Sequence, residues 1–358
     1  MTPFTSFETI STVSVSPPVD CRVGRLGIKE TRLLNGQPGT PHVPKLSEVL
    51  FERKEHSFAS LAAMPSNVEA IEAALQFAAG MADFVAIVGP SGWGKTHLLR
   101  AVAYRLSLDG GAFLDPASAT EFLATPQRLE ANQPLVLDDV QDVLGKARQR
   151  LALRFALERR VRAGRPTILA FTSPKPTRQI RAFLPGARDW SVVSMGEPTA
   201  DERVLLLNQM ATAEGLALSP RLVKILADQM HGNGRTLSGA LKRLRLTDPS
   251  WLDTGGTLRA LGLLEPFFAD NSGWDLKRRI LRLADRHRAQ FGKVNPLDLA
   301  IYTMLREAGL AESDVARCTD LSNSDVYQRA VRFQKQLETC DVTRANVRQF
   351  VELVVGSL

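Results

Sequence analysis

Residues 84–106, FVAIVGPSGWGKTHLLRAVAYRL, place an apolar β-type run, a glycine-rich turn and a helical segment in direct succession. Residues 89–96, GPSGWGKT, match the pattern G-x-x-x-x-G-K-[ST], which requires a strand before it and a helix after it. Glycines let backbone N–H groups close around phosphate oxygens, and the helix N-terminus adds its positive end. A chance glycine-rich turn is the alternative, but strand, loop and helix agree, so the stretch predicts a nucleotide-binding loop.

The motif gives particular side chains a role. Lys95 is expected to reach the β- and γ-phosphates, and Thr96 to offer its hydroxyl to Mg²⁺. ATP or ADP with Mg²⁺ is therefore the expected cofactor. The predicted nucleotide-binding residues of the loop are Gly89, Pro90, Ser91, Gly92, Trp93, Gly94, Lys95, Thr96 and His97.

Around the loop, apolar runs of strand type alternate with helical segments. The runs are 84–88, 111–115, 134–139, 167–172 and 191–195. Continuous apolar strands separated by helices indicate a parallel sheet covered on both faces. The predicted fold class is α/β, with a loose arm (1–50), a P-loop parallel-sheet core (51–198), a helical lid (199–270) and a C-terminal all-α helix-turn-helix domain (271–358), the last two meeting at a joint near 271–273.

Composition limits the class of protein. The chain has 358 residues, 44% hydrophobic residues and only three cysteines, a balance typical of a globular protein without a disulfide framework or zinc site. We find no apolar run of about 18 residues and no secretory signal, so the sequence predicts a cytoplasmic protein, with association with the nucleoid an open possibility. A net charge of +7 permits a polyanionic partner without establishing one.

An acidic pair follows the loop in PLVLDDV (134–140). A buried strand ending there brings both carboxylates near the phosphates, where Asp138 is predicted to hold Mg²⁺ through water and Asp139 to orient the attacking water. A solvent-facing pair at a strand end is the alternative. Thr172 and Ser173 close the neighbouring strand and are candidate sensors of the γ-phosphate or ordinary strand caps. Arg235 begins a lid helix, where it either folds onto the phosphates or is a solvated charge.

Together these stretches resemble the bacterial replication initiator DnaA and its relatives, which are AAA+ ATPases. HSFASLAAMPSN resembles the segment that covers the adenine, LVLDDVQDVLGK the Walker B strand, and AGRPTILAFTSPKPTRQI the sensor strand. GNGRTLSGALKRL is similar to the lid helix, which makes Arg235 the second sensor arginine. The resemblance runs in order from about His56 to Leu244.

The tail extends the resemblance. Residues 300–338 are similar to the family's DNA-binding helix-turn-helix domain, with helices expected at Ala311–Cys318 and Ser324–Leu337. A generic α-hairpin has the same pattern. Residues 274–291 form a basic amphipathic segment suited to DNA phosphates, to an anionic membrane surface or simply to solvent. The candidate DNA contacts are Arg278, Arg282, Arg329, Arg332 and Lys335.

Three departures from the family matter. Only one short helix fits between the second strand and the acidic pair, as in regulatory relatives such as Hda. The arginine-finger position falls on Ala187, and Arg188, one place along, is the candidate catalytic residue that replaces it. We therefore expect slow hydrolysis. The family's base-reading motif is replaced by Ser322–Val326, so weakly or non-canonically selective DNA binding is expected.

The leading hypothesis is a DnaA-like ATPase that binds DNA or replication proteins under the control of ATP and can self-associate on ATP. It would act in initiation of replication or in its regulation. A regulatory adaptor without DNA binding, docking on an initiator or a clamp, is the first alternative. A helicase loader or transposition helper ATPase is the second.

Overall fold

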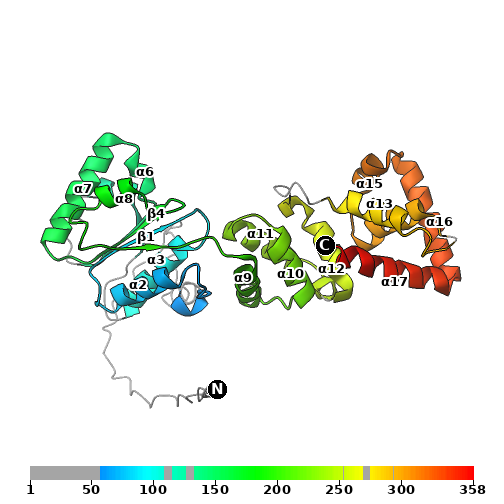
Figure 1. Ribbon diagram of the computed structural model, residues 1–358, viewed down its shortest axis with the longest axis horizontal. Helices are drawn as coiled ribbons and strands as arrows, with labels where there is room; N and C mark the ends of the chain where they lie inside the picture. Colours follow the sequence, from blue (N-terminus) through cyan, green and yellow to red (C-terminus); the bar gives the residue numbers. More distant parts are fainter. Residues whose placement is uncertain (1–56, 109–114, 126–132, 253, 269–274, 293) are drawn as a thin grey trace, which may run out of the picture. The chain divides into compact units, whose positions relative to one another are not determined.

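The computed structural model describes residues 57–108, 115–125, 133–252, 254–268, 275–292 and 294–358 (Figure 1). The predicted arm (1–50), the joint (271–273) and residues 111–114 of the expected second strand lie outside these ranges. Within them, no helix is both long and apolar enough to cross a membrane.

A parallel sheet of five strands forms the core, in the order β2-β3-β4-β1-β5. The strands are β1 (Phe84–Gly89), β2 (Ala117–Ser118), β3 (Leu135–Asp138), β4 (Thr167–Thr172) and β5 (Ser191–Ser194). Four predicted strands are confirmed to within one residue at each end, whereas β2 begins later than the run expected for it. β1 is buried along its whole length because β4 and β5 flank it and helices cover both sheet faces.

The core helices divide between the two sheet faces (Figure 1). They are η1 (Phe58–Ser60), α2 (Val68–Ala78), α3 (Lys95–Leu108), α4 (Ala119–Ala124), α6 (Gln141–Leu144), α7 (Ala147–Arg162) and α8 (Arg178–Phe183). Helices α2 and α3 pack on the face that carries Val85 and Ile87. Helices α4, α7 and α8 pack on the opposite face, with Ala86 and Val88. Successive side chains along β1 point to opposite faces of the sheet and therefore belong to two separate apolar layers.

A buried arginine fastens the starts of two strands. Arg160 on α7 is 1% exposed, and its guanidinium donates to the carbonyl oxygens of Gln133 and Pro166 and to Thr167 Oγ1, at 2.8, 3.1 and 3.0 Å. Burial, and next the charge of Arg165, lowers the pKa of Arg160 to about 10. These acceptors lie just before β3 and at the start of β4, so Arg160 holds the two strands in register.

In the described ranges after β5, every regular element is a helix, as predicted. In the lid region they are α9 (Ala200–Ala213), α10 (Pro220–Gln229), α11 (Gly234–Leu244), η2 (Pro249–Leu252), η3 (Thr254–Gly256), α12 (Thr257–Leu263) and η4 (Glu265–Phe268). Further on they are α13 (Leu276–Arg286), α14 (Pro296–Tyr302), the π-helical turn η5 (Thr303–Glu307), α15 (Glu312–Thr319), α16 (Asn323–Thr339) and α17 (Asp341–Gly356). The expected helices at 311–318 and 324–337 correspond to α15 and α16.

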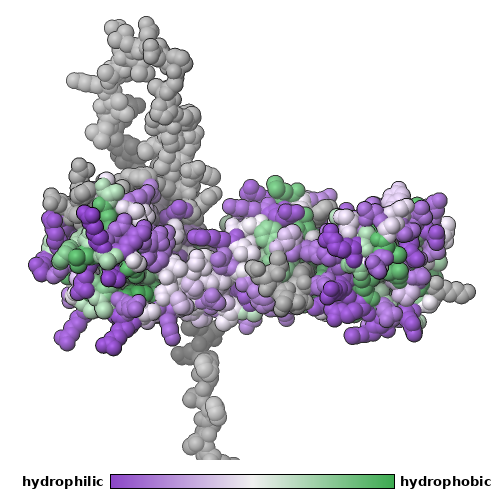
Figure 2. All heavy atoms as spheres, turned by 90° about the horizontal axis from the view of Figure 1, so that it is seen from above, coloured by the Kyte–Doolittle hydropathy of each residue, from purple (hydrophilic) through white to green (hydrophobic). Residues whose placement is uncertain are grey.

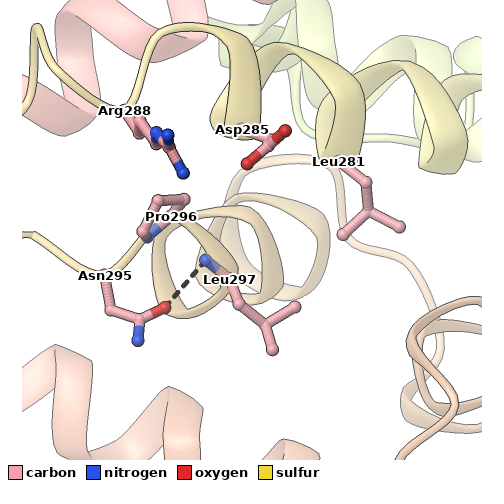
Figure 3. Close-up of a pocket in the computed structure, with 6 residues that line it drawn as sticks. All are labelled: Leu281, Asp285, Arg288, Asn295, Pro296 and Leu297. Carbon is pink, nitrogen blue, oxygen red and sulfur yellow. Dashed lines mark hydrogen bonds between the residues drawn. The ribbon is translucent and has the colours of Figure 1, made fainter.

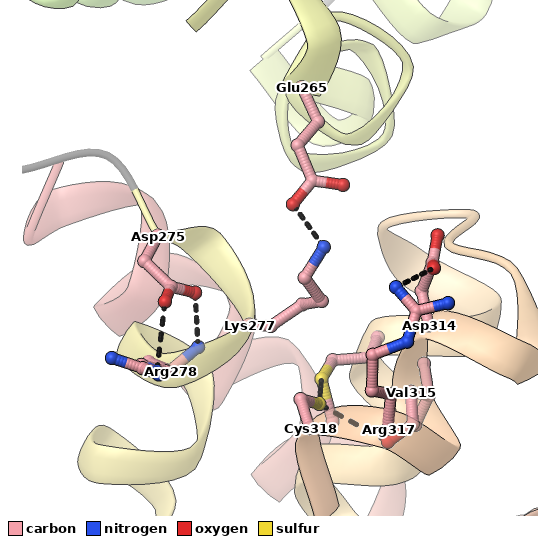
Figure 4. A network of polar contacts seen from close by, with 9 residues as sticks. Glu265, Asp275, Lys277, Arg278, Asp314, Val315, Arg317 and Cys318 are labelled. Carbon is pink, nitrogen blue, oxygen red and sulfur yellow. Dashed lines mark hydrogen bonds and ion pairs between the residues drawn. The ribbon is translucent and has the colours of Figure 1, made fainter. Parts of the chain in front are cut away.

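The two helical regions share one buried apolar cluster, which includes Leu241 on α11, Phe268 on η4 and Ile280 on α13. Polar contacts add to it (Figure 4). Lys277 Nζ donates to Glu265 Oε1 at 2.5 Å, joining α13 to η4. The predicted division at 270/271 therefore separates helices that share a core, and that boundary stays a prediction.

Candidate nucleotide-binding site

The loop between β1 and α3 has the backbone that its glycines permit. Gly92 and Gly94 have φ values of +82° and +98°, in the left-handed region that disfavours side chains. A Cβ on Gly89 would lie 2.3 Å from the carbonyl oxygen of Met195, which continues the chain from β5. Glycine is therefore required both for the turn and for the close approach of a neighbouring strand end.

Two side chains at the start of α3 carry the polar chemistry of the loop. Lys95 is 5% exposed and its Nζ donates to the carbonyl oxygen of Pro90 at 2.7 Å. Burial lowers the pKa of Lys95, and the charge of Arg235 acts in the same direction, against the opposing carboxylates of Asp138 and Asp139. Thr96 Oγ1 donates to Asp138 Oδ2 at 2.6 Å. The two residues predicted to share a metal ion thus lie in direct contact.

The acidic pair is split between two environments. Asp138 is buried at the end of β3, and its Oδ1 accepts the N–H of Asp139 at 2.8 Å. Asp139 is exposed and has a left-handed φ of 51°, which turns the chain out of the strand. Gln141 Nε2 donates to Asp139 Oδ1 at 2.8 Å, and Gln141 Oε1 accepts the N–H of Thr172 at 2.8 Å. Gln141 therefore joins the ends of β3 and β4.

Gln141 is a residue of this region that no sequence motif predicts. Its only signal is its position two residues after the acidic pair. At the end of β4, Ser173 N donates to the carbonyl oxygen of Gly89 at 3.0 Å, and Ser173 Oγ donates to that of Lys175 at 2.9 Å. The Ser173 hydroxyl is thus engaged within its own turn, and the sensing role of Thr172 and Ser173 stays a prediction.

The first turn of α11 lies against the loop. Asn233 Oδ1 accepts the N–H groups of Arg235 and Thr236 at 3.0 and 3.3 Å, capping the helix. A Cβ on Gly92 would lie 2.4 Å from Cγ of Asn233, and a Cβ on Gly234 would lie 2.6 Å from the carbonyl oxygen of Gly92. Arg235 is exposed and close enough to Lys95 to influence its pKa.

Further predicted residues surround the loop. His97 Nε2 lies 2.8 Å from Ser60 Oγ, which links α3 to η1 in the lead-in segment, residues 57–67 before α2. Trp93 is partly buried against the apolar cluster of the lid. Arg188 is exposed in the segment between α8 and β5. Its predicted role as a finger stays a prediction.

The candidate DNA contacts differ in their surroundings. Arg329 Nη1 is 2.7 Å from Asp298 Oδ1, so its charge is already paired. Arg278 pairs with Asp275 at 3.2 Å but remains 80% exposed (Figure 4). Arg282, Arg332 and Lys335 are exposed.

A pocket between α13 and α14 is separate from these features (Figure 3). It is lined by Leu281, Asp285, Arg288, Asn295, Pro296 and Leu297. Its Asn295 Oδ1 accepts the N–H of Leu297 at 2.9 Å, which caps α14. None of the lining residues belongs to the candidate nucleotide site.

Known proteins match somewhat less than half of this chain in sequence. No family model matches it. An uncharacterized protein of Haemophilus influenzae is 29% identical over 168 residues, covering 45% of this chain and 72% of that protein. The chromosomal replication initiator protein DnaA of Dechloromonas aromatica is 28% identical over 177 residues, covering 44% of this chain. The chain is a divergent DnaA-like protein.

The likeness is limited in extent. The match spans only 37% of the length of the Dechloromonas initiator. The crystal structure of domain III of Thermotoga maritima DnaA superposes with a TM-score of 0.50 and 20% identity, covering 60% of this chain and 98% of that one. The DnaA-like chain therefore has the AAA+ P-loop fold, as its sequence predicts.

Proposed function

We propose that this DnaA-like chain binds ATP, hydrolyses it slowly, and acts in the initiation of DNA replication or in its regulation. The contact between Thr96 and Asp138 carries the proposal. It places a hydroxyl and a carboxylate 2.6 Å apart at the mouth of a glycine loop, beside a buried lysine. Hydroxyl and carboxylate oxygens are the donors that Mg²⁺ prefers, and the left-handed glycines leave backbone N–H groups free to face phosphates.

The residues fit the expected cofactor. Thr96 and Asp138 would hold Mg²⁺, and the ion would neutralise charge on the β- and γ-phosphates. Lys95 would bind the phosphates, while Asp139, positioned by Gln141, would orient water. Arg235 lies on the first turn of α11. A contact of its side chain with the γ-phosphate, which ADP lacks, would favour one position of the lid only when ATP is bound.

Nucleotide binding is tested by titration calorimetry with ATP and Mg²⁺. Lys95→Ala removes the buried ammonium group, and we expect at least a tenfold weaker affinity, about 1.4 kcal/mol. Lys224→Ala, which removes an exposed lysine on α10, is the matched control and should leave the affinity unchanged. Equal affinity of the Lys95→Ala variant and the control would contradict the proposal.

The C-terminal helices are the proposed DNA-binding part. Arg332 and Lys335 are exposed on α16 and form no ion pair with the residues that the structure describes, whereas Arg329 must first leave Asp298 to reach a phosphate. Phosphate contacts of this kind position a protein on DNA without reading sequence. Weakly selective DNA binding, contacts with replication proteins and self-association on ATP are parts of the same proposal.

One observation favours an adaptor without DNA binding. Asp325 is exposed in the first turn of α16, where its carboxylate accepts from Ser322 Oγ at 2.7 Å and places negative charge at the helix start. That charge opposes an approaching phosphate. Replacing Arg332 and Lys335 together with Glu distinguishes the two functions, because DNA binding is lost only if α16 meets DNA.

A further inference from the structure

Helix α17 leads from the α15–α16 pair back to the lid helices (Figure 1). Its last turns attach there through side chains of α10. Arg221, in the first turn of α10, pairs with the Glu352 carboxylate at 2.6 Å, and its Nη2 donates to the Glu352 carbonyl oxygen at 3.3 Å. Gln229, the last residue of α10, donates through Nε2 to the carbonyl oxygen of Leu358 at 3.0 Å. Contacts at both ends of α10 fix the direction of α17 relative to the lid.

The end of α17 is capped by side chains of other helices. The last carbonyl oxygens of an α-helix have no partner within the helix and form its negative end. Besides Arg221 and Gln229 on α10, Arg279 on α13 donates to the carbonyl oxygen of Ser357. Two cations and an amide therefore stabilise this end of α17 only while it stays on α10 and α13.

Apolar side chains strengthen the attachment. Phe350, Val354 and Val355 on α17 are at most 4% exposed, and they belong to the apolar cluster that the lid and the C-terminal helices share. The ring of Phe350 packs edge-on against that of Phe291, which follows α13, with centroids 5.6 Å apart. Figure 2 shows strongly hydrophilic residues over much of the visible surface of the C-terminal helices. Apolar burial thus supplies most of the free energy of the contact, and the polar groups fix its direction.

The other end of α17 is held just as closely. A single residue, Cys340, separates the end of α16 from the start of α17. Leu337 on α16 and Val347 on α17 are both buried in the same apolar cluster. Because one residue joins the two helices and both share a core, α16 cannot turn independently of α17.

We propose that α17 is a strut that fixes the α15–α16 pair to the lid, so that the pair and the lid move as one rigid body. A change in the position of α11 then carries α16 with it and does not release it. The contacts that form the strut lie outside the nucleotide loop and require neither ATP nor DNA. The proposal is therefore independent of the proposed function.

The test is a distance measurement by pulsed electron paramagnetic resonance on the full chain. Spin labels are attached at Lys242→Cys on α11 and Lys335→Cys on α16, both exposed lysines, after the three native cysteines are replaced by serine. We expect one narrow distance distribution, with the same mean without nucleotide, with ADP and with ATP. A broad distribution, or a mean that shifts with nucleotide, would overturn the proposal.

Variants of the ion pair separate a strut from a merely compact fold. Arg221→Glu places like charge beside Glu352 and removes a donor to the end of α17, so the narrow distribution should broaden. Adding Glu352→Arg restores an opposite pair and should narrow the distribution again. Lys224→Glu makes the same charge change on an exposed side of α10 and should leave the distribution narrow.

Circular dichroism checks that every variant is folded. Equal widths in Arg221→Glu and Lys224→Glu, or no recovery in the double variant, would also overturn the proposal.

Discussion

Gln141 connects the two strand ends that carry the proposed site, through both ends of its amide group. Gln141→Ala leaves the N–H of Thr172 without its acceptor and frees Asp139, so we expect ATP hydrolysis to fall about tenfold while ATP affinity stays within about twofold. Gln141→Glu keeps the acceptor but repels Asp139. Single-turnover hydrolysis and calorimetry measure the two effects. Hydrolysis at the wild-type rate in both variants would show that the bridge has no role in the reaction.

Sequence predicts some residues of the site better than others. The roles of Lys95 and Thr96 follow from a motif whose spacing fixes the backbone, and they stay predictions. The structure places Thr96 Oγ1 in hydrogen-bond contact with Asp138 Oδ2. Gln141 and Arg160 were not foreseen. In a sequence, a polar residue after a strand and an arginine on a helix are both expected to face solvent. Only the strand order brings the hydrogen-bond partners of Gln141 and Arg160 together.

At the scale of elements, Glu202 fastens the start of α9 to the core. Its side chain is 6% exposed and accepts the N–H groups of Ser66 and Thr199, each at 2.7 Å. Burial alone would raise the pKa of Glu202, but these hydrogen bonds outweigh it and hold the pKa below its usual value. The carboxylate therefore joins the lead-in segment to the first lid helix.

Replacing the Glu202 carboxylate should weaken the connection between the lead-in segment and α9. Glu202→Gln turns an amide N–H₂ toward one of the two donors, and we expect a loss of about 1–3 kcal/mol in the free energy of unfolding at pH 7. Because the folded pKa is depressed, the difference from wild type should persist above the unfolded pKa, roughly 4.3, and disappear as pH falls through the folded value. Asp201→Asn, one residue away and exposed, is the control for denaturant unfolding. Equal stability of Glu202→Gln and wild type would contradict this role.

Strands β1, β3 and β4 were predictable because parallel strands buried on both faces are continuously apolar, and that pattern fixes their ends. The role of each exposed helix face was not predictable from the sequence. The face of α7 shows in the sequence only as a charge run, which is typical of any solvated helix. Only the fold shows that its apolar residues Leu151 and Phe155 are turned away from the sheet.

Across the whole molecule, we propose that ATP acts as a switch for DNA binding. The nucleotide loop contacts the first turn of α11, and α11 shares a buried cluster with the C-terminal helices. A ligand that favours one position of α11 can therefore bias helices that lie beyond the lid. The coupling free energy of such switches is typically about 1–3 kcal/mol.

The measurement that tests this claim most directly is fluorescence anisotropy near physiological salt on a duplex with a DnaA box, a scrambled duplex and a single strand, each with ATP and with ADP. The account predicts duplex binding that is about tenfold tighter with ATP, with little preference between the two duplexes, and loss of the nucleotide effect in Arg235→Ala. Equal affinity with ATP and ADP, or no binding to any of the three DNAs, would contradict it.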